Sequence, residues 1–155
     1  MRNYIPTINI SSLLNHNFDS ISSKNTIEKI KKACIEVGFF QIIEHGISKK
    51  DIRNITKVGN IFFNSSIKNK MKLSPKKWNN LNKNIYRGYF PNDVNGKEGL
   101  DIGDLKITKK YALKLKKPYI EDLDFNKAIN KKSISVLKNY FDQTFILGEI
   151  LFKSI

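Results

Sequence analysis

The stretch Glu36-Val-Gly-Phe-Phe-Gln-Ile-Ile-Glu-His-Gly46 decides how the rest of the chain is interpreted. Before it, apolar residues recur at the spacing of a helix. Gly38 suits a helix exit, because glycine reaches positive φ without steric cost. Positions 39–43 then carry two phenylalanines, a glutamine and two β-branched isoleucines, a mainly apolar run that is typical of a mostly buried strand. The pair His45-Gly46 turns the chain into a second helix. The stretch therefore predicts a helix, a buried strand and another helix, around which a sheet can form.

Upstream of this stretch the pattern predicts a short strand, a loop and the start of the first helix. Ile5–Ile10 alternates apolar and polar residues after its proline, as a half-buried strand does. Ser11–Ser23 is polar and predicts a loop with at most one helical turn. Asn25 and Glu28 have the spacing of a capping box, and the apolar positions that follow form one face of a helix.

Downstream, Ser48 and Asp51 again have capping-box spacing, and the helical pattern continues to about Phe63. A short helical piece follows at 67–73. The periodicity then disappears from 74 to 103. A loop of this length is usually functional or disordered, and its aromatic and glycine content favours an ordered functional loop with brief strands near 87–90 and 100–102.

The last predicted element is a long amphipathic helix. Asp124 is predicted to cap it, and its apolar pattern is still strong at Ile155, the last residue. We expect its apolar face to need a partner. An interrupted helix of this kind favours a truncated or split product.

Composition indicates one globular domain over residues 1–155, since 40% of the residues are hydrophobic and 27% are charged. The N-terminus has no apolar core of signal-peptide length, and no window has the length of a membrane span. A lone cysteine, Cys34, forms no internal disulfide and is expected to pack as a small core residue. We expect a soluble cytoplasmic protein.

The net charge of +14 invites comparison with nucleic-acid-binding proteins. Its distribution argues against that function. Lysines are spread along the whole chain, whereas arginine, the usual reader of bases, occurs only as Arg2, Arg53 and Arg87. Lysine, asparagine and isoleucine are all abundant and all have A/T-rich codons, so a composition bias explains the charge at least as well as a polyanionic partner.

Several segments, in this order, resemble the N-terminal region of the 2-oxoglutarate/Fe(II) dioxygenases of the isopenicillin N synthase type. The combination is specific, although each piece alone is weak. The matching pieces are Ile-Pro-Thr-Ile-Asn-Ile at Ile5, Ala33-Cys34 through Gly-Phe-Phe-Gln-Ile-Ile to His45-Gly46-Ile47, Phe62-Phe63, Arg-Gly-Tyr-Phe-Pro at Arg87 and Lys-Glu-Gly-Leu-Asp-Ile-Gly at Lys97. The resemblance implies an α+β chain: helices and a few outer strands from the N-terminal part of a jelly-roll barrel, with the barrel incomplete.

That family holds Fe(II) with a His-x-Asp pair and a distant histidine, and binds 2-oxoglutarate with an Arg-x-Ser motif. Three such ligands leave positions open for the keto acid and O₂. None of these motifs occurs in this chain, whose only histidines are His16 and His45. His16 is separated from Asp19 by one residue too many, and His45 matches a histidine that is not a ligand. We therefore expect no catalytic, cofactor-binding or metal-binding residues here, with Fe(II) and 2-oxoglutarate bound only in a complete relative.

The resemblance leaves two substrate-side candidates, Arg87 and Tyr89. Arg87 would pair with an anionic substrate group, and Tyr89 would supply a pocket wall and a hydroxyl. The alternative is structural: Arg87 forms a salt bridge with Glu98 or Asp101, while Tyr89 packs in the core. Gly88, Gly99 and Gly103 are expected to serve backbone geometry.

Three explanations of the chain's shortness remain open. It is a truncated gene product, or one half of a split enzyme whose catalytic half docks on it, or a non-catalytic binding module with a basic surface, with nucleic acid as one partner. The small-molecule substrate of a complete enzyme does not follow from this sequence. Strands without their barrel neighbours would leave open edges, so we also expect low stability or self-association.

Overall fold

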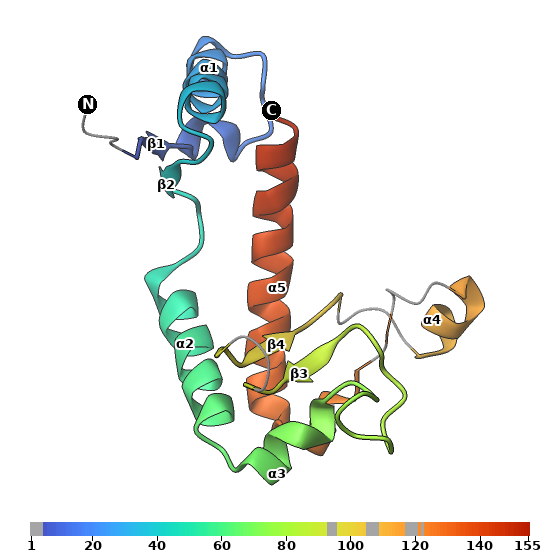
Figure 1. The fold of residues 1–155 in the computed structure, drawn as a ribbon. Helices are drawn as coiled ribbons and strands as arrows, with labels where there is room; N and C mark the ends of the chain where they lie inside the picture. The colour runs from blue at the N-terminus through green and yellow to red at the C-terminus, as the bar shows by residue number, and fades with distance from the viewer. Residues whose placement is uncertain (1–4, 93–95, 105–108, 117–120, 122) are drawn as a thin grey trace. The chain divides into compact units, whose positions relative to one another are not determined.

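The computed structural model describes residues 5–92, 96–104, 109–116, 121 and 123–155 (Figure 1). The chain forms two compact units. One comprises Met1–Ile52 together with Tyr140–Ile155, and the other comprises Arg53–Asn139. Two helices, α2 (Lys49–Phe63) and α5 (Lys131–Phe152), each contribute residues to both units.

The first unit is built on two short parallel strands, β1 (Thr7–Asn9) and β2 (Gln41–Ile43). Their central pair is Ile8 opposite Ile42. Further backbone hydrogen bonds extend the pairing, from Gln41 N to Pro6 O at 2.8 Å and from Ile10 N to Ile43 O at 3.1 Å. The strand predicted near the N-terminus and the one predicted after Gly38 are therefore confirmed, and they are neighbours.

A short 3-10 turn, η1 (Ser11–Leu13), follows β1, and helix α1 (Ile21–Glu36) begins earlier than predicted. Its N-cap is Ser20, whose hydroxyl accepts a hydrogen bond from Ser23 N at 3.2 Å. The sequence pattern missed this first turn because its inward-facing positions carry hydroxyl groups. Ser23 Oγ donates to Ser12 O at 2.9 Å, and the Thr26 and Ser12 hydroxyls are 2.9 Å apart. These buried polar groups are satisfied, so the face packs without being apolar.

Gly38 ends α1 with φ +90°, as predicted. The expectation that the following strand is mostly buried is wrong. Phe39 is 58% exposed and Ile43 is 47% exposed. Among the described strands β2 pairs with β1 alone, so one edge of each strand is unpaired. A strand with one neighbour does not bury the side chains that a central parallel strand would bury.

Apolar side chains from β1, η1, α1 and the C-terminal part of α5 form the core of the first unit. The six buried members are Ile8, Ile10, Leu13, Ile30, Ala33 and Ile150. Cys34 is partly buried and packs against this cluster, in agreement with its predicted structural role.

Helix α2 begins with the predicted capping box and ends at Phe63, also as predicted. Ser48 Oγ accepts from Asp51 N at 3.0 Å and donates to Asp51 Oδ2 at 2.6 Å. The short helical piece is α3 (Ile67–Lys70) followed by the 3-10 turn η2 (Met71–Leu73). The capping box at Ser48 and Asp51 depends on local chemistry, which is why the sequence reveals it. The capping box predicted at Asn25 and Glu28 is wrong, because Ser20 caps α1.

The second unit contains an antiparallel pair of strands, β3 (Gly88–Phe90) and β4 (Gly99–Asp101), which confirms the two brief strands that the sequence predicts. Tyr89 lies opposite Leu100. Helix α4 (Lys109–Leu115) and the turn η3 (Phe125–Lys127) complete the described elements.

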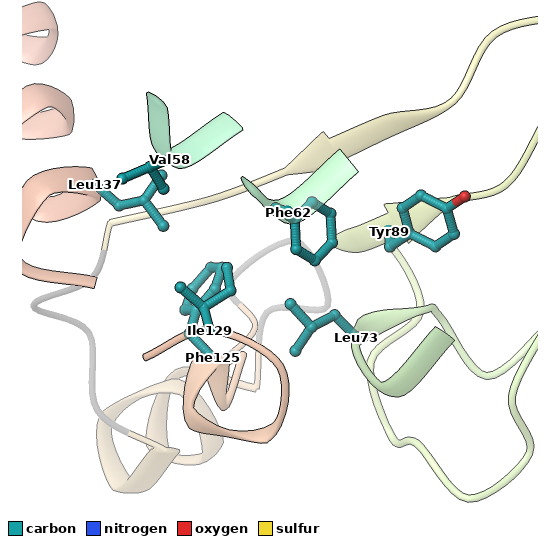
Figure 2. Packing of buried hydrophobic residues seen from close by; sticks show 7 residues of the cluster. All are labelled: Val58, Phe62, Leu73, Tyr89, Phe125, Ile129 and Leu137. Atoms are coloured by element: carbon teal, nitrogen blue, oxygen red, sulfur yellow. The ribbon is translucent and has the colours of Figure 1, made fainter. Parts of the chain in front are cut away.

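One apolar cluster fills the second unit (Figure 2). The Phe62 and Tyr89 rings meet edge to face, with centroids 5.9 Å apart. The cluster draws on α2, η2, β3, η3 and the first turns of α5; its members are Val58, Phe62, Leu73, Tyr89, Phe125, Ile129 and Leu137. Because Tyr89 belongs to it, this core anchors β3, which directly follows Arg87.

Asp124 is a capping residue, but of η3 and not of the long helix, so this prediction is wrong. Its Oδ1 accepts from Asn126 N at 3.2 Å. The long helix α5 starts at Lys131, and Asn130 Oδ1 accepts from Ser133 N at 2.9 Å at its beginning. Asn130, six positions after Asp124, is also a favourable N-cap residue, and it caps α5 in place of Asp124.

The described chain is thus α+β, with two separate two-stranded sheets and no closed barrel among the described strands. None of the helices in the described ranges combines the length and the hydropathy needed to cross a bilayer.

Candidate functional site

Tyr89 lies at the centre of a polar network inside the second unit. Its side chain is only 1% exposed, and its hydroxyl donates to Glu98 Oε2 at 2.6 Å. The same oxygen accepts from Lys70 Nζ at 2.7 Å, and Lys70 Nζ also donates to Phe63 O at 3.0 Å. The ammonium lies 5.3 Å from the centre of the Tyr89 ring. A buried cation is thereby neutralised and hydrogen-bonded.

The three groups shift one another's titration. The hydrogen bond to Glu98 raises the pKa of Lys70, against the effect of burial. The hydrogen bonds from Lys70 and then Tyr89 lower the pKa of Glu98. Burial, followed by the hydrogen bond to Glu98, raises the pKa of Tyr89. At neutral pH the network is therefore a lysine cation, a carboxylate and a neutral phenol, an arrangement that ties α3 to the β3–β4 hairpin.

Arg87 precedes β3 and its guanidinium lies against the backbone of the segment after β4. Nη1 donates to Ile102 O at 2.8 Å. A Cβ atom added at Gly103 would lie 2.5 Å from the guanidinium, so a larger residue there would force the Arg87 side chain to shift. Gly103 thus serves the close approach of a side chain. From the sequence, Glu98 and Asp101 are the candidate salt-bridge partners of Arg87. In the structure, Glu98 forms an ion pair with Lys70.

The irregular segment before β3 is held by asparagine side chains that reach the backbone. Asn82 Nδ2 donates to Ser74 O at 2.6 Å, and Asn84 Nδ2 donates to Arg87 O at 2.5 Å. Asn79 Nδ2 donates to Met71 O at 2.9 Å. Asn82 and Asn84 are both buried. Sequence reasoning attributed the asparagines to composition and so missed these contacts, although Asn in an aperiodic segment is a known signal of turns.

Glu121 reaches this segment from a distant position in the chain. Its carboxylate accepts hydrogen bonds from three consecutive backbone N–H groups: Ile85 N at 2.5 Å, Tyr86 N at 2.9 Å and Arg87 N at 3.0 Å. Successive backbone N–H groups that converge in a turn form a concave anion-binding nest. We call the three N–H groups the 85–87 nest. No local sequence pattern predicts this contact, because Glu121 is 34 residues from Arg87, the nearest of the three donors in the sequence.

The two histidines lie in separate local settings. His45 Nδ1 accepts from Ile47 N at 3.2 Å, which stabilises the turn into α2. His16 is exposed, has φ +58°, and its ring meets Phe18 edge to face. Over the described ranges, His, Cys, Asp and Glu side chains form no group of three or more that could hold a metal ion.

The C-terminal part of α5 carries an open apolar groove of about 430 Å³. Phe145 and Phe152 are among the large exposed hydrophobic residues of the chain, at 57% and 83%. The complete lining is Phe141, Thr144, Phe145, Gly148, Glu149 and Phe152. An exposed aromatic surface of this kind usually marks an interaction site.

Comparison with known proteins agrees with the resemblance seen in the sequence. Residues 5–131 match the family described as "non-haem dioxygenase in morphine synthesis N-terminal". The 2-oxoglutarate-dependent dioxygenase tropC of Talaromyces stipitatus is 34% identical over 87 residues, which are 56% of this chain and 26% of that protein. The 1-aminocyclopropane-1-carboxylate oxidase of Dictyostelium discoideum is 39% identical over 79 residues, which are 48% of this chain and 20% of that protein.

A plant protein is similar over a shorter region. Protein DOWNY MILDEW RESISTANCE 6 of Arabidopsis thaliana is 45% identical over 47 residues, which are 30% of this chain and 14% of that protein. The chain thus spans about a quarter or less of the length of each of these relatives. Because the family match covers most of the sequence, the chain belongs to the family of non-haem dioxygenase N-terminal domains.

Proposed function

We propose that this chain serves as the N-terminal domain of a 2-oxoglutarate/Fe(II)-dependent oxygenase that oxidises a small molecule in the cytoplasm. The observation that carries the proposal is the family match over residues 5–131. Relatives named as 2-oxoglutarate-dependent dioxygenases add support. In the complete enzyme the two short sheets would extend a jelly-roll barrel whose remaining strands come from a C-terminal catalytic part.

Iron and 2-oxoglutarate do not fit the residues of this chain. The sequence contains neither a His-x-Asp pair nor an Arg-x-Ser motif, and His16 and His45 make local contacts at separate turns. We assign both groups to the catalytic part. Fe(II) held there by two imidazoles and a carboxylate would supply open positions for the keto acid and O₂.

On the substrate side, the proposal keeps Arg87 as a partner for an anionic substrate group. It lies directly before β3, on backbone held by Asn84 and by the core residue Tyr89. For Tyr89, the full burial of the side chain and its bond to Glu98 favour the structural alternative over a pocket wall.

The groove on α5 supports docking of a catalytic part. Its aromatic side chains would otherwise remain in water, at a cost of about 25 cal/mol for each Å² of apolar surface. The matched region is only 26% of one relative and 20% of another, so these relatives have further residues that would cover such a groove. We therefore place the contact with the catalytic part at this groove.

The first experiment is to sequence the coding DNA beyond the codon for Ile155 in all three frames. A downstream His-x-Asp, distal histidine and Arg-x-Ser support the proposal, and the encoded polypeptide is then co-expressed with this chain. We expect the two to co-purify and to form succinate from 2-oxoglutarate with Fe(II). If no such motifs follow, the oxygenase relationship describes ancestry only, and the alternative of a non-catalytic binding module with a basic surface takes its place.

The docking contact has its own test with matched variants. Phe152 and Leu81 are both highly exposed apolar residues, at 83% and 86%, but Phe152 lines the groove and Leu81 lies in the other unit. We expect Phe152→Asp to weaken co-purification at least tenfold and Leu81→Asp to leave it unchanged. Equal effects of the two variants would contradict docking at the groove.

A further inference from the structure

The 85–87 nest has the geometry of a binding site for a carboxylate. One carboxylate oxygen of Glu121 accepts from Ile85 N, and the other accepts from both Tyr86 N and Arg87 N. A planar, two-oxygen anion matches this division of donors. Hydrogen bonds from backbone N–H groups to a charged acceptor are roughly twice as strong as those between neutral groups.

The nest is built by contacts that do not involve Glu121. Asn84 Nδ2, which is buried, donates to Leu73 O at 3.3 Å and to Arg87 O at 2.5 Å, and so spans the turn from inside. Asn84 O accepts from Lys76 N at 2.7 Å. Gly88 follows with φ +117°, and a Cβ atom added there would lie 1.9 Å from Leu73 O. Because these anchors do not involve Glu121, we expect the turn to keep its shape when the Glu121 carboxylate leaves it.

The nest also lies at the surface. Ile85 and Tyr86, which supply two of its three N–H groups, are 57% and 53% exposed. A ligand therefore reaches the turn from solvent once the Glu121 side chain moves aside. The high positive charge of the chain favours the approach of any anion.

We propose that the 85–87 nest is a carboxylate-binding site that Glu121 occupies as a built-in competitor, and that a ligand carboxylate binds there by displacing it. This inference is independent of the proposed oxygenase role, because it concerns backbone donors of this chain alone. The recognised chemistry is a carboxylate on a small molecule or at the end of a peptide. Displacement of Glu121 would release residue 121 from the segment that carries Arg87, which couples ligand binding to the position of that segment.

The test is an NMR titration of the ¹⁵N-labelled 155-residue chain with sodium propionate. Each addition of propionate replaces an equal concentration of sodium chloride, so that the ionic strength stays constant. The amide signals of Ile85, Tyr86 and Arg87 report binding. We expect Glu121→Ala to show saturable shifts at these amides with an affinity at least tenfold above that of the wild type. Glu121→Gln keeps a neutral acceptor, so an intermediate affinity is expected.

The matched control is Glu28→Ala, which removes an exposed carboxylate of α1 that pairs with Lys31 at 3.8 Å. It should titrate like the wild type.

The proposal is overturned if folded Glu121→Ala shows no saturable shifts at these amides, or if the wild type and Glu28→Ala show the same affinity as Glu121→Ala. If Glu121→Ala does not fold, Glu121→Gln decides: affinity equal to that of the wild type would overturn the proposal. A parallel titration with inorganic phosphate should shift these amides less, and stronger binding of phosphate would refute the carboxylate assignment.

Discussion

At the residue scale, Gly88 shows how a single backbone position decides the geometry around Arg87 and Tyr89. Its φ is +117°, and a Cβ atom there would lie 1.9 Å from Leu73 O. We expect Gly88→Ala to lower the free energy of unfolding by about 3 kcal/mol or more, because left-handed strain adds to a clash with backbone. Urea denaturation followed by circular dichroism measures the change.

The matched control for this substitution is Gly59→Ala. Gly59 lies within α2, and a Cβ atom added there meets nothing within 4 Å. Alanine is the better helix former by about 1 kcal/mol, so this variant should be slightly more stable than the wild type. A Gly88→Ala protein as stable as Gly59→Ala would show that the turn before β3 is not constrained as described.

The Lys70–Glu98–Tyr89 network leads to a second prediction at this scale. Glu98→Gln leaves the buried Lys70 ammonium without its charged partner, and we expect a loss of about 1–3 kcal/mol in the free energy of unfolding at pH 7. Lys97→Gln, which alters the neighbouring residue, is the control and should cost little. If Glu98→Gln and Lys97→Gln are equally stable, the network does not contribute to folding.

The same network predicts a pH dependence. The folded pKa of Glu98 lies below its ordinary value of 4.5, so its contribution is complete above that pH and is lost as the pH falls through the folded pKa. The folded pKa of Lys70 is raised above 10.5, so its contribution is present below that pH and is lost only as the pH rises through the higher folded value. We expect the stability difference between wild type and Glu98→Gln to be flat around neutrality and to shrink below about pH 4. A difference that persists unchanged at pH 2 would contradict this account.

At the element scale, two isoleucines of helix α1 allow the contribution of core packing to stability to be measured separately from that of helix propensity. Ile30 is 0% exposed and belongs to the core of the first unit, whereas Ile35 is 75% exposed on the same helix. We expect Ile30→Ala to destabilise the first unit by about 2–5 kcal/mol, the cost of a cavity in a packed core. Ile35→Ala should be neutral or slightly stabilising, since alanine favours helix.

Urea unfolding of the two variants measures this difference, and amide hydrogen exchange within α1 and β1 locates it. The description of the core would be wrong if Ile30→Ala and Ile35→Ala unfolded at the same urea concentration. Because the chain forms two compact units, exchange in β3 and β4 serves as an internal reference.

The elements also show where sequence patterns succeed and fail. The capping box at Ser48 and the end of α2 at Phe63 are local, and the sequence predicts both. The first turn of α1 is missed because Ser23 and Thr26 are buried through hydroxyl hydrogen bonds, which look like loop chemistry in a sequence. The cap of α5 is misplaced because Asp124 and Asn130 are both competent caps within one short segment.

At the scale of the whole molecule, the sequence predicts an absence of turnover. The 155 residues contain no His-x-Asp pair and no Arg-x-Ser motif. We expect the purified chain, supplied with Fe(II), 2-oxoglutarate and O₂, to form no succinate above a no-protein control. Iron-dependent succinate production by this chain would overturn the assignment of metal and co-substrate binding to a separate part.

The sequence by itself determined the family, the order of the four strands, the end of α1 and both ends of α2, because these depend on ordered motifs, on periodicity and on capping chemistry within a few residues of each other. Only the tertiary structure decided that Lys70, Tyr89 and Glu98 form one network and that the Arg87 guanidinium lies against Ile102 O and Gly103. It alone placed the Glu121 carboxylate on the 85–87 nest. These contacts join positions 9 to 36 residues apart through aperiodic segments, and no local pattern encodes which distant side chain a turn will meet.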